Sequence, residues 1–308
     1  MKASAPGKII LFGEHAAVYT RPALAVPVTQ VHVDVEILDS SRPGIWIQAP
    51  DIDLQAELGS LPDNHPIGSV ILKVFQRLGI SSPLPALNIS IESTIPVAAG
   101  LGSGAAVSVA LIRAVSGYLG QPLPDADVNE IAYEIEKLHH GTPSGIDNTV
   151  IAYARPVYFI KGRPLETFKA GKPFTIVIGD TGILAPTKQA VGDVRRLWMR
   201  DQYNVEGIFN EIAQISLIGR RSIESGRPEL LGELMDQNHA YLQTLTVSCP
   251  ELDTLVEAAR SAGALGAKLS GSGRGGNMIA LVDQPKAEFV SGALISAGAV
   301  RTIVTEIK

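Results

Sequence analysis

Three glycines in one short segment are the first residues of this sequence that could do chemistry. Gly100, Gly102 and Gly104 lie in the segment 96–106, and an apolar, alanine-rich run follows as far as Leu119. Glycines let the backbone turn its N–H groups toward a ligand, and a helix N-terminus adds the positive end of its dipole. A tight strand-to-helix turn would also explain the glycines, but the long apolar run after them favours an anion-binding loop.

This loop is not one of the widespread nucleotide-binding motifs. The chain contains no Gly-x₄-Gly-Lys-Ser/Thr sequence and none of the His-Arg-Asp or Asp-Phe-Gly elements of protein kinases. A second segment, 271–276, satisfies Gly-x-Gly-x-x-Gly, but an apolar strand-like run follows it where a dinucleotide-binding fold requires a helix. We interpret 271–276 as a flexible wall over an active site.

Two carboxylates lie on either side of a third turn. Asp147 follows the Gly-, Pro- and Ser-containing segment 141–145, a composition that can hold a carboxylate rigidly at the edge of a cleft. Glu136 flanks the apolar stripe of a helix expected over 125–139, from which it could reach a magnesium ion. Taken alone, Glu136 is better explained as a solvated helix charge, which is the commoner situation.

The composition narrows the class of protein. A length of 308 residues, of which 45% are hydrophobic and 19% charged, predicts a globular chain of two fused domains. The net charge of −5 argues against a nucleic-acid partner. Cys249 is the only cysteine, so an intrachain disulfide and a Cys-rich metal site are both excluded. The sequence shows no signal-peptide pattern and no stretch of about 18 apolar residues, so we expect a cytoplasmic protein with no membrane partner.

Hydrophobic periodicity predicts the elements that position these segments. Helices are expected over 63–78, 105–119 and 125–139, and the second half should be mostly helical up to residue 261. Strands are expected near 8–12, 31–37, 87–91, 157–160, 174–178, 278–282 and 300–307. Glycines and prolines cluster between 162 and 173, which favours a boundary near 165–175. Strands in both halves predict an α+β fold.

Together the motifs resemble those of the GHMP kinases, a family of ATP-dependent small-molecule kinases. The resemblance extends from residue 3 to about residue 282 and rests on the segments 8–16, 96–106, 140–148, 180–182 and 268–273. It implies an N-terminal domain of the ribosomal-S5-like type over 1–170. It also implies a C-terminal ferredoxin-like domain over 171–308, which would contain the loop 271–276. ATP and the acceptor would lie in the cleft between the two domains.

The resemblance also implies roles for individual residues. Asp147 would be the catalytic carboxylate and Lys8 its partner beside the acceptor hydroxyl, while Glu136 and Ser103 would hold Mg²⁺. The acceptor would meet Glu14, His15, Thr181, Gly271 and Ser272. The ATP phosphates would be wrapped by Pro96, Ala98, Ala99, Gly100, Leu101, Gly102, Ser103, Gly104, Ala105 and Ala106.

The sequence departs from the family pattern at two positions. Gly104 stands where family members commonly carry the second of two serines; Ser103 next to it would either contact a phosphate oxygen or Mg²⁺ or cap the following helix through a backbone N–H. Arg274 stands where the family often has glycine, and either adds a positive charge near the phosphates or is solvated.

The segment 13–16, Gly-Glu-His-Ala, joined to the motif at 140–148, points to mevalonate as the acceptor. The implied reaction moves the γ-phosphoryl group of ATP onto the primary hydroxyl of mevalonate, a step of isoprenoid biosynthesis. Phosphomevalonate, homoserine or a sugar is the alternative acceptor. A non-catalytic ligand sensor is disfavoured, because a sensor has no chemical reason to keep Asp147, Lys8 and Glu136 together. The oligomeric state is left open, a homodimer included.

Overall fold

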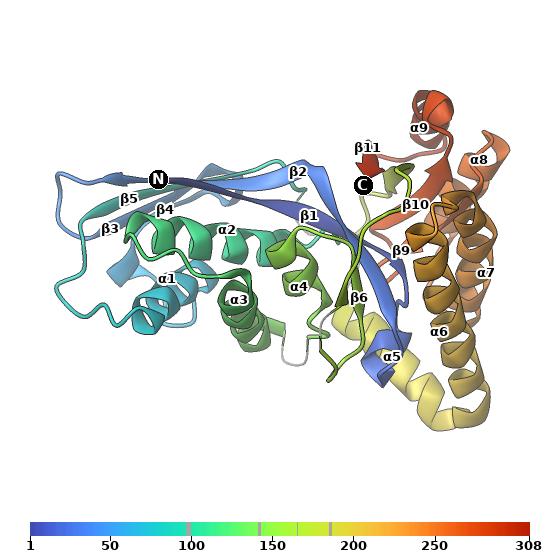
Figure 1. Cartoon of the computed structure of the whole chain (residues 1–308), viewed down its shortest axis with the longest axis horizontal. Helices are drawn as coiled ribbons and strands as arrows, with labels where there is room; N and C mark the ends of the chain where they lie inside the picture. Colours follow the sequence, from blue (N-terminus) through green and yellow to red (C-terminus); the bar gives the residue numbers. More distant parts are fainter. Residues whose placement is uncertain (97–99, 141–142, 165, 185–186) are drawn as a thin grey trace. The chain divides into compact units, whose positions relative to one another are not determined.

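The computed structural model describes residues 1–96, 100–140, 143–164, 166–184 and 187–308 (Figure 1). The chain folds into two compact units. The first unit contains residues 1–7, 31–96 and 102–154, and the second contains 8–30, 155–308 and the described part of 97–101. Each unit is made of several separate chain segments, so a single boundary does not divide them. The expected division into 1–170 and 171–308 therefore stays a prediction.

Strands of the first unit pair in the order β4-β3-β5-β2. The second half of β2 (Ala23–Asp39) runs antiparallel to β5 (Leu87–Ser93), which pairs in parallel with β3 (Ile45–Ala49). The edge strand β4 (Leu54–Glu57) runs antiparallel to β3. The alternation predicted for β2 is confirmed: its apolar face is buried, at Val31, Val33, Val35 and Ile37.

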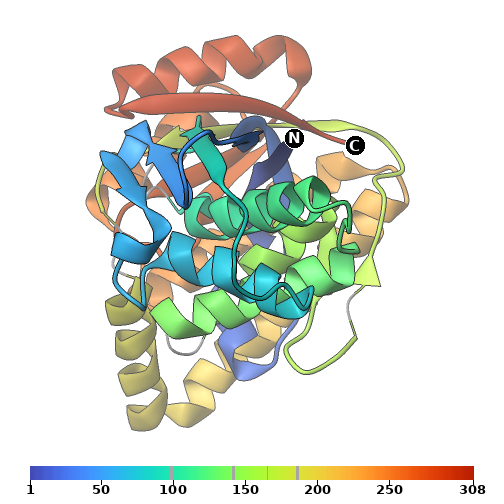
Figure 2. The ribbon, with the colours of Figure 1, turned by 90° about the vertical axis from the view of Figure 1, so that its left-hand side faces the viewer.

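Four helices lie on one side of these strands, as both views show (Figures 1 and 2). They are α1 (Pro66–Arg77), α2 (Ser103–Tyr118), α3 (Asp125–His140) and α4 (Ile146–Tyr153). The first three were predicted, although α2 begins two residues earlier than expected. Helix α2 is buried nearly all round because α1, α3 and α4 all pack against it. Helix α4 was not predicted, since two turns are too short to give a clear period.

Strands β8 (Phe174–Asp180), β9 (Gly266–Ser270), β10 (Asn277–Val282) and β11 (Arg301–Ile307) form the main sheet of the second unit. Every pairing is antiparallel, in the order β11-β8-β10-β9. Helices separate β8 from β9 and β10 from β11. When these strands are numbered from β8 as the first to β11 as the fourth, their order across the sheet is fourth, first, third, second. Helices form the crossovers, and this is the ferredoxin-like arrangement. The expected fold class is confirmed, although β9 itself was not predicted.

Helices of the second unit enclose this sheet. They are α5 (Thr187–Arg200), α6 (Gln202–Glu224), α7 (Leu231–Thr244), α8 (Pro250–Ser261) and α9 (Ala287–Ser296). Helices α7 and α8 pack on β9, and α9 packs on β8 and β11. The core between them is apolar and includes Phe209, Leu242, Leu252, Leu269 and Met278.

The second unit also contains the first half of β2, which pairs with β6 (Val157–Phe159), and β6 in turn pairs with β7 (Glu166–Thr167). Strand β1 (Lys2–Phe12) pairs with β2 and, like β2, has residues in both units. Short 3₁₀ helices complete the chain at Ala16–Tyr19, Pro50–Ile52, Leu58–Ser60, Pro228–Leu230 and Gln284–Lys286.

Two glycines bring α7 unusually close to β9. A Cβ atom placed on Gly266 would lie 2.0 Å from the carbonyl oxygen of Gly232, and one on Gly232 would lie 2.2 Å from the carbonyl oxygen of Leu265. Neither position tolerates a side chain, because the obstacles are backbone atoms that cannot move aside. The approach fixes β9 against α7, and β9 carries residues that matter below.

Within the described ranges, no helix combines the length and the apolar character that crossing a membrane requires.

Candidate active site

The N-terminus of α2 is built to receive an anion. Its N-cap is Gly102, with φ 78°, and no side chain of the described residues caps the helix by a hydrogen bond. Gly100 also has a positive φ of 75°, which favours glycine at both turns of the loop. The first N–H groups of a helix have no acceptor within the helix, and its dipole favours negative charge there. The predicted phosphate loop therefore has the right local chemistry.

The other residues predicted for this loop differ in what they can offer. Ser103 is the first residue of α2 rather than its N-cap, so its hydroxyl stands at the mouth of the helix. A Cβ atom on Gly104 would meet nothing within 4 Å among the described residues, so this position leaves space for a ligand. The N–H of Ala106 donates to the Gly102 carbonyl oxygen at 2.9 Å and is thus used within the helix.

The flanking positions of the loop are buried or half-buried. Leu101 and Ala105 are buried, and Pro96 is half-buried. The Leu101 carbonyl oxygen accepts a hydrogen bond from the N–H of Lys8 at 2.9 Å, which joins the phosphate loop to the strand of the proposed catalytic lysine. Ala98 and Ala99 lie outside the described residues.

Asp147 lies in the first turn of α4 and is half-buried. Gly145, with φ 88°, precedes that helix as its N-cap. The start of α4 is held by Asn129 of α3, which sequence reasoning missed. Its Oδ1 accepts hydrogen bonds from Asn148 Nδ2 at 2.6 Å and from Thr149 Oγ1 at 3.3 Å.

Asn129 lies on the helix that carries Glu136 and contacts the helix that carries Asp147, and all three residues belong to the first unit. Glu136 follows it by seven residues on α3, about two helical turns, so the two side chains lie on the same face. One helix therefore carries Glu136 and also grips the two residues directly after Asp147. A polar amide inside a helix was the only signal for Asn129 in the sequence.

In the second unit, the turn formed by residues 13–15 faces inward. Gly13 has φ 101°, and a Cβ atom there would lie 2.4 Å from the Cα of Ala23, so only glycine fits. His15 also adopts a left-handed φ of 60°. The turn directs both Glu14 and His15 into the protein, where they are 3% and 6% exposed.

His15 is a neutral imidazole, and only one of its two ring nitrogens has a hydrogen-bond partner within the described residues. Its Nε2 lies 3.0 Å from the carbonyl oxygen of Ser272. A carbonyl only accepts, so Nε2 carries the proton and Nδ1 presents a lone pair. Within the described part of the chain Nδ1 is buried and has no hydrogen-bond partner. Burial lowers the pKa of His15 to about 4. The turn thus holds a neutral imidazole whose Nδ1 is an unused hydrogen-bond acceptor within the described residues.

Glu14 is held by groups of the protein itself. Its carboxylate pairs with the ammonium of Lys268, and both side chains are fully buried. Asn238 Nδ2 of α7 donates to the second carboxylate oxygen at 3.2 Å, and Lys268 Nζ also donates to the Leu269 carbonyl oxygen at 2.5 Å. Burial raises the pKa of Glu14 and lowers the pKa of Lys268, each against the charge of its partner. Contact between Glu14 and an acceptor stays a prediction.

The glycine-rich segment 271–276 is tied down at several points. Thr181 Oγ1 and Thr181 N–H both donate to the Gly276 carbonyl oxygen at 2.9 Å. Thr187 Oγ1 donates to Ser272 Oγ at 3.2 Å. Arg274 forms an ion pair with Asp193 of α5, and its side chain stays partly exposed. These contacts tie the segment to Thr181 and to α5, and its role as a wall over an active site stays a prediction.

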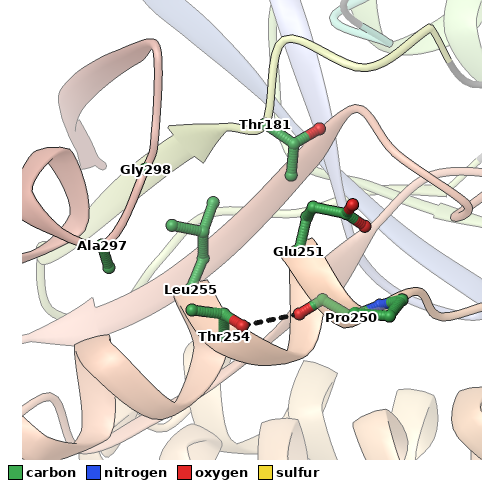
Figure 3. Close-up of a pocket in the computed structure, with 7 residues that line it drawn as sticks. All are labelled: Thr181, Pro250, Glu251, Thr254, Leu255, Ala297 and Gly298. Atoms are coloured by element: carbon green, nitrogen blue, oxygen red, sulfur yellow. Dashed lines mark hydrogen bonds between the residues drawn. The ribbon is translucent and has the colours of Figure 1, made fainter.

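Thr181 also lines a small cavity under β8 (Figure 3). The cavity has a volume of about 190 Å³ and is otherwise lined by Pro250, Glu251, Thr254, Leu255, Ala297 and Gly298. The Thr181 methyl group points toward the helix that carries Glu251 and Leu255, while its hydroxyl points away from that helix. A volume below about 300 Å³ is too small for a nucleotide. The cavity is therefore no alternative to the loop at α2.

Comparison with known proteins identifies the family. The family model for the GHMP kinase N-terminal domain matches residues 65–155, and the model for the GHMP kinase C-terminal domain matches residues 220–300. Mevalonate kinase of Thermococcus gammatolerans is 37% identical, over 99% of this chain and 95% of its own length. Human mevalonate kinase is 30% identical, over 96% and 90%. The chain belongs to the GHMP kinase family.

Solved structures agree with this assignment. Leishmania major mevalonate kinase, crystallised with R-mevalonate, superposes with a TM-score of 0.86 at 27% identity, covering 100% of this chain and 96% of that one. Methanococcus jannaschii mevalonate kinase gives the same score and identity, covering 100% and 98%. Streptococcus pneumoniae phosphomevalonate kinase, at 18% identity and TM-score 0.82, shares the fold.

The buried histidines predict how stability depends on pH. His239 Nδ1 accepts from the Leu269 N–H at 3.3 Å, and burial lowers the pKa of His239 to about 4, as it does for His15. The unfolded chain, in which histidine has a pKa near 6.5, binds more protons between these values. Stability should therefore be complete above about pH 6.5 and fall toward pH 4, with a slope of up to roughly 1.4 kcal/mol per pH unit for each histidine.

Urea unfolding at pH 7.5, 6 and 5 measures this slope. His239→Gln should flatten it, because the variant lacks the buried imidazole whose pKa is lowered. A His239→Gln variant with an unchanged slope would contradict the prediction.

Proposed function

We propose that this protein transfers the γ-phosphoryl group of ATP to the primary hydroxyl of mevalonate, giving 5-phosphomevalonate and ADP. The observation that carries the proposal is the full-length similarity, at 30–37% identity, to mevalonate kinases from archaea and human. The phosphomevalonate kinase and galactokinase structures, at 17–18% identity, share the fold and give no such support to another acceptor. We further propose a cytoplasmic location, which suits an ATP-dependent enzyme with one cysteine.

Phosphoryl transfer leaves little covalent chemistry to the protein, which mainly positions groups and neutralises charge. In the proposed step the acceptor oxygen bonds to the γ-phosphorus, the bond to the β–γ bridging oxygen breaks, and ADP leaves. Asp147 takes the hydroxyl proton, and Lys8 steadies the developing negative charge. The N-terminus of α2 meets the phosphates with the first N–H groups of the helix, which suits a chain whose net charge is −5.

We propose His15 and Ser272 for the acceptor side, together with Gly271, Glu14 and Thr181. His15 supports this best, because its buried Nδ1 lacks a partner in the described ranges and can accept from a hydroxyl. Ser272 fixes the tautomer of His15 through its carbonyl oxygen. Thr181 would act through Gly276, to which its hydroxyl is bonded.

We also propose Mg²⁺ as a cofactor, with Glu136 and Ser103 as its protein ligands. One carboxylate and one hydroxyl fit this ion, which usually takes one or two protein oxygens and completes its shell with phosphates and water. No group of three or more His, Cys, Asp or Glu suited to a metal occurs among the described residues, as expected for an ion that arrives with a nucleotide. When bound, it would neutralise charge on the phosphates.

An acceptor panel tests the proposed function. ADP release should be fast with mevalonate and at least about a hundredfold slower with phosphomevalonate, homoserine and galactose, because a site built for one hydroxyl acid leaves polar groups unpaired with the others. Mass spectrometry should find one added phosphate on mevalonate. Equal or faster turnover of another acceptor would replace mevalonate in the proposal.

Asp147→Asn tests the proposed base. The amide cannot take a proton, so turnover should fall at least ~10²-fold while MgATP still binds and the melting temperature hardly changes. Asp125→Asn is the matched control, since Asp125 also lies in the first turn of a helix but pairs with Arg113 at the surface. Retention of more than a third of wild-type turnover by Asp147→Asn would exclude the role.

Glu136→Gln tests the proposed metal ligand. A neutral amide oxygen binds a hard cation poorly, so the Mg²⁺ concentration for half-maximal rate should rise several-fold, with a smaller change in the KM for mevalonate. Glu130→Gln on the same helix is the control, because Glu130 is exposed and paired with Arg77. Superimposable Mg²⁺ curves for wild type and Glu136→Gln would mean that Glu136 is a solvated helix charge.

A further inference from the structure

Alternate residues of one chain segment hold the turn that carries His15. Lys268 and Ser270 lie two apart on β9, and a strand places such residues on the same face. Ser272 follows two residues later. Each of the three contacts the N-terminal segment 10–15 of the same compact unit: Lys268 pairs with Glu14, Ser270 with Ile10 and Ser272 with His15.

Ser270 acts as a strand neighbour for β1. Its Oγ accepts from the Ile10 N–H at 3.2 Å and donates to the Ile10 carbonyl oxygen at 2.9 Å. One hydroxyl thus satisfies both backbone groups of a single residue, which lies two positions after Lys8. These two hydrogen bonds hold β1 against β9 at Ile10.

Lys268 is the deepest of the three contacts. Its side chain has no exposed surface, and an ammonium buried in this way is stable only with a paired charge and further acceptors. It has both, in the Glu14 carboxylate and the Leu269 carbonyl oxygen. The lysine thereby fixes one end of the turn at Glu14, while Ser272 fixes the adjacent residue, His15.

The support behind these contacts is rigid. Strand β9 is paired along its length with β10, and its start is pressed against α7 at Gly266 and Gly232. The same helix supplies Asn238 to the other oxygen of Glu14. Displacement of the turn would therefore have to break the ion pair itself.

We propose that Lys268 is a positioning residue for the acceptor site, acting through Glu14 on the orientation of His15. The proposal rests on the proposed function, in which His15 meets the acceptor. Lys268 cannot touch any substrate, because its side chain is fully buried. Its loss should therefore change the KM for mevalonate through the geometry of the turn, and leave the KM for ATP alone.

Kinetics of four variants of the full-length protein test this proposal. Lys268→Met keeps most of the side-chain length and removes the charge, and should raise the KM for mevalonate at least about fivefold, within the range of coupling between contacting residues. The KM for ATP should stay within about twofold. Ser270→Ala should shift the KM for mevalonate in the same direction by less. Lys268→Arg keeps a positive charge opposite Glu14 and should stay closer to wild type in both KM values than Lys268→Met; if Lys268→Met does not fold, Ser270→Ala carries the test, and an unchanged KM for mevalonate in that variant would contradict the proposal.

Leu269→Ala is the matched control. Leu269 lies on the same strand, faces the apolar core on the opposite side and is equally buried. Its truncation should lower the melting temperature and leave both KM values near wild type, since it cuts no contact to the segment 10–15. Assays run at least ten degrees below the melting temperature of the least stable variant.

Hydrogen exchange supplies a readout that does not depend on activity. Amides of residues 10–16 should exchange faster in Lys268→Met than in wild type, and should stay protected in Leu269→Ala. Unchanged exchange in this segment, unchanged KM for mevalonate, or equal KM changes in Lys268→Met and Leu269→Ala would each overturn the proposal. If wild type does not phosphorylate mevalonate at all, the proposed function fails, and exchange still decides whether Lys268 anchors the turn.

Discussion

The buried ion pair between Glu14 and Lys268 is the constraint that holds the turn at residues 13–15, to which we assign the acceptor side of the proposed site. Two charges without exposed surface are costly unless each is matched, and here Asn238 and the Leu269 carbonyl complete the match. A hydrophobic pair of similar size would hold the turn at no such cost. The ion pair and its two further hydrogen bonds fix Glu14, and the next residue, His15, is held by the Ser272 carbonyl oxygen with its Nδ1 buried.

The site proposed for the phosphates relies on backbone groups rather than side chains. An acidic protein needs local positive potential to bind a polyanion, and α2 would supply it through its N-terminus and the two positive-φ glycines before it. Burial of α2 among α1, α3 and α4 keeps this dipole fixed. Packing also fixes the position of Asp147, because Asn129 of α3 accepts hydrogen bonds from the two residues that follow it in α4.

The periodic elements were predictable because burial repeats along the chain. Strand β2 and helices α1 and α3 each bury one set of regularly spaced residues, and this spacing is visible in the sequence; α2, which is buried nearly all round, is visible as a long apolar run. Helix α4 and strand β9 were not predicted. The first is two turns long, and the second contains a lysine and small residues in place of an alternating apolar pattern.

The family could be recognised from the sequence alone, and the loop proposed for phosphate and the residues proposed for chemistry could be named from it, because glycine spacing and short motifs are local properties. The residues that support them became visible only in the folded chain. Lys268 and Glu14 are 254 positions apart, Ser270 and Ile10 are 260 apart, and no local pattern encodes such a pairing. Arg274 shows the same limit: its ion pair with Asp193 of α5, 81 positions earlier in the chain, could not be read from the glycine loop in which it lies.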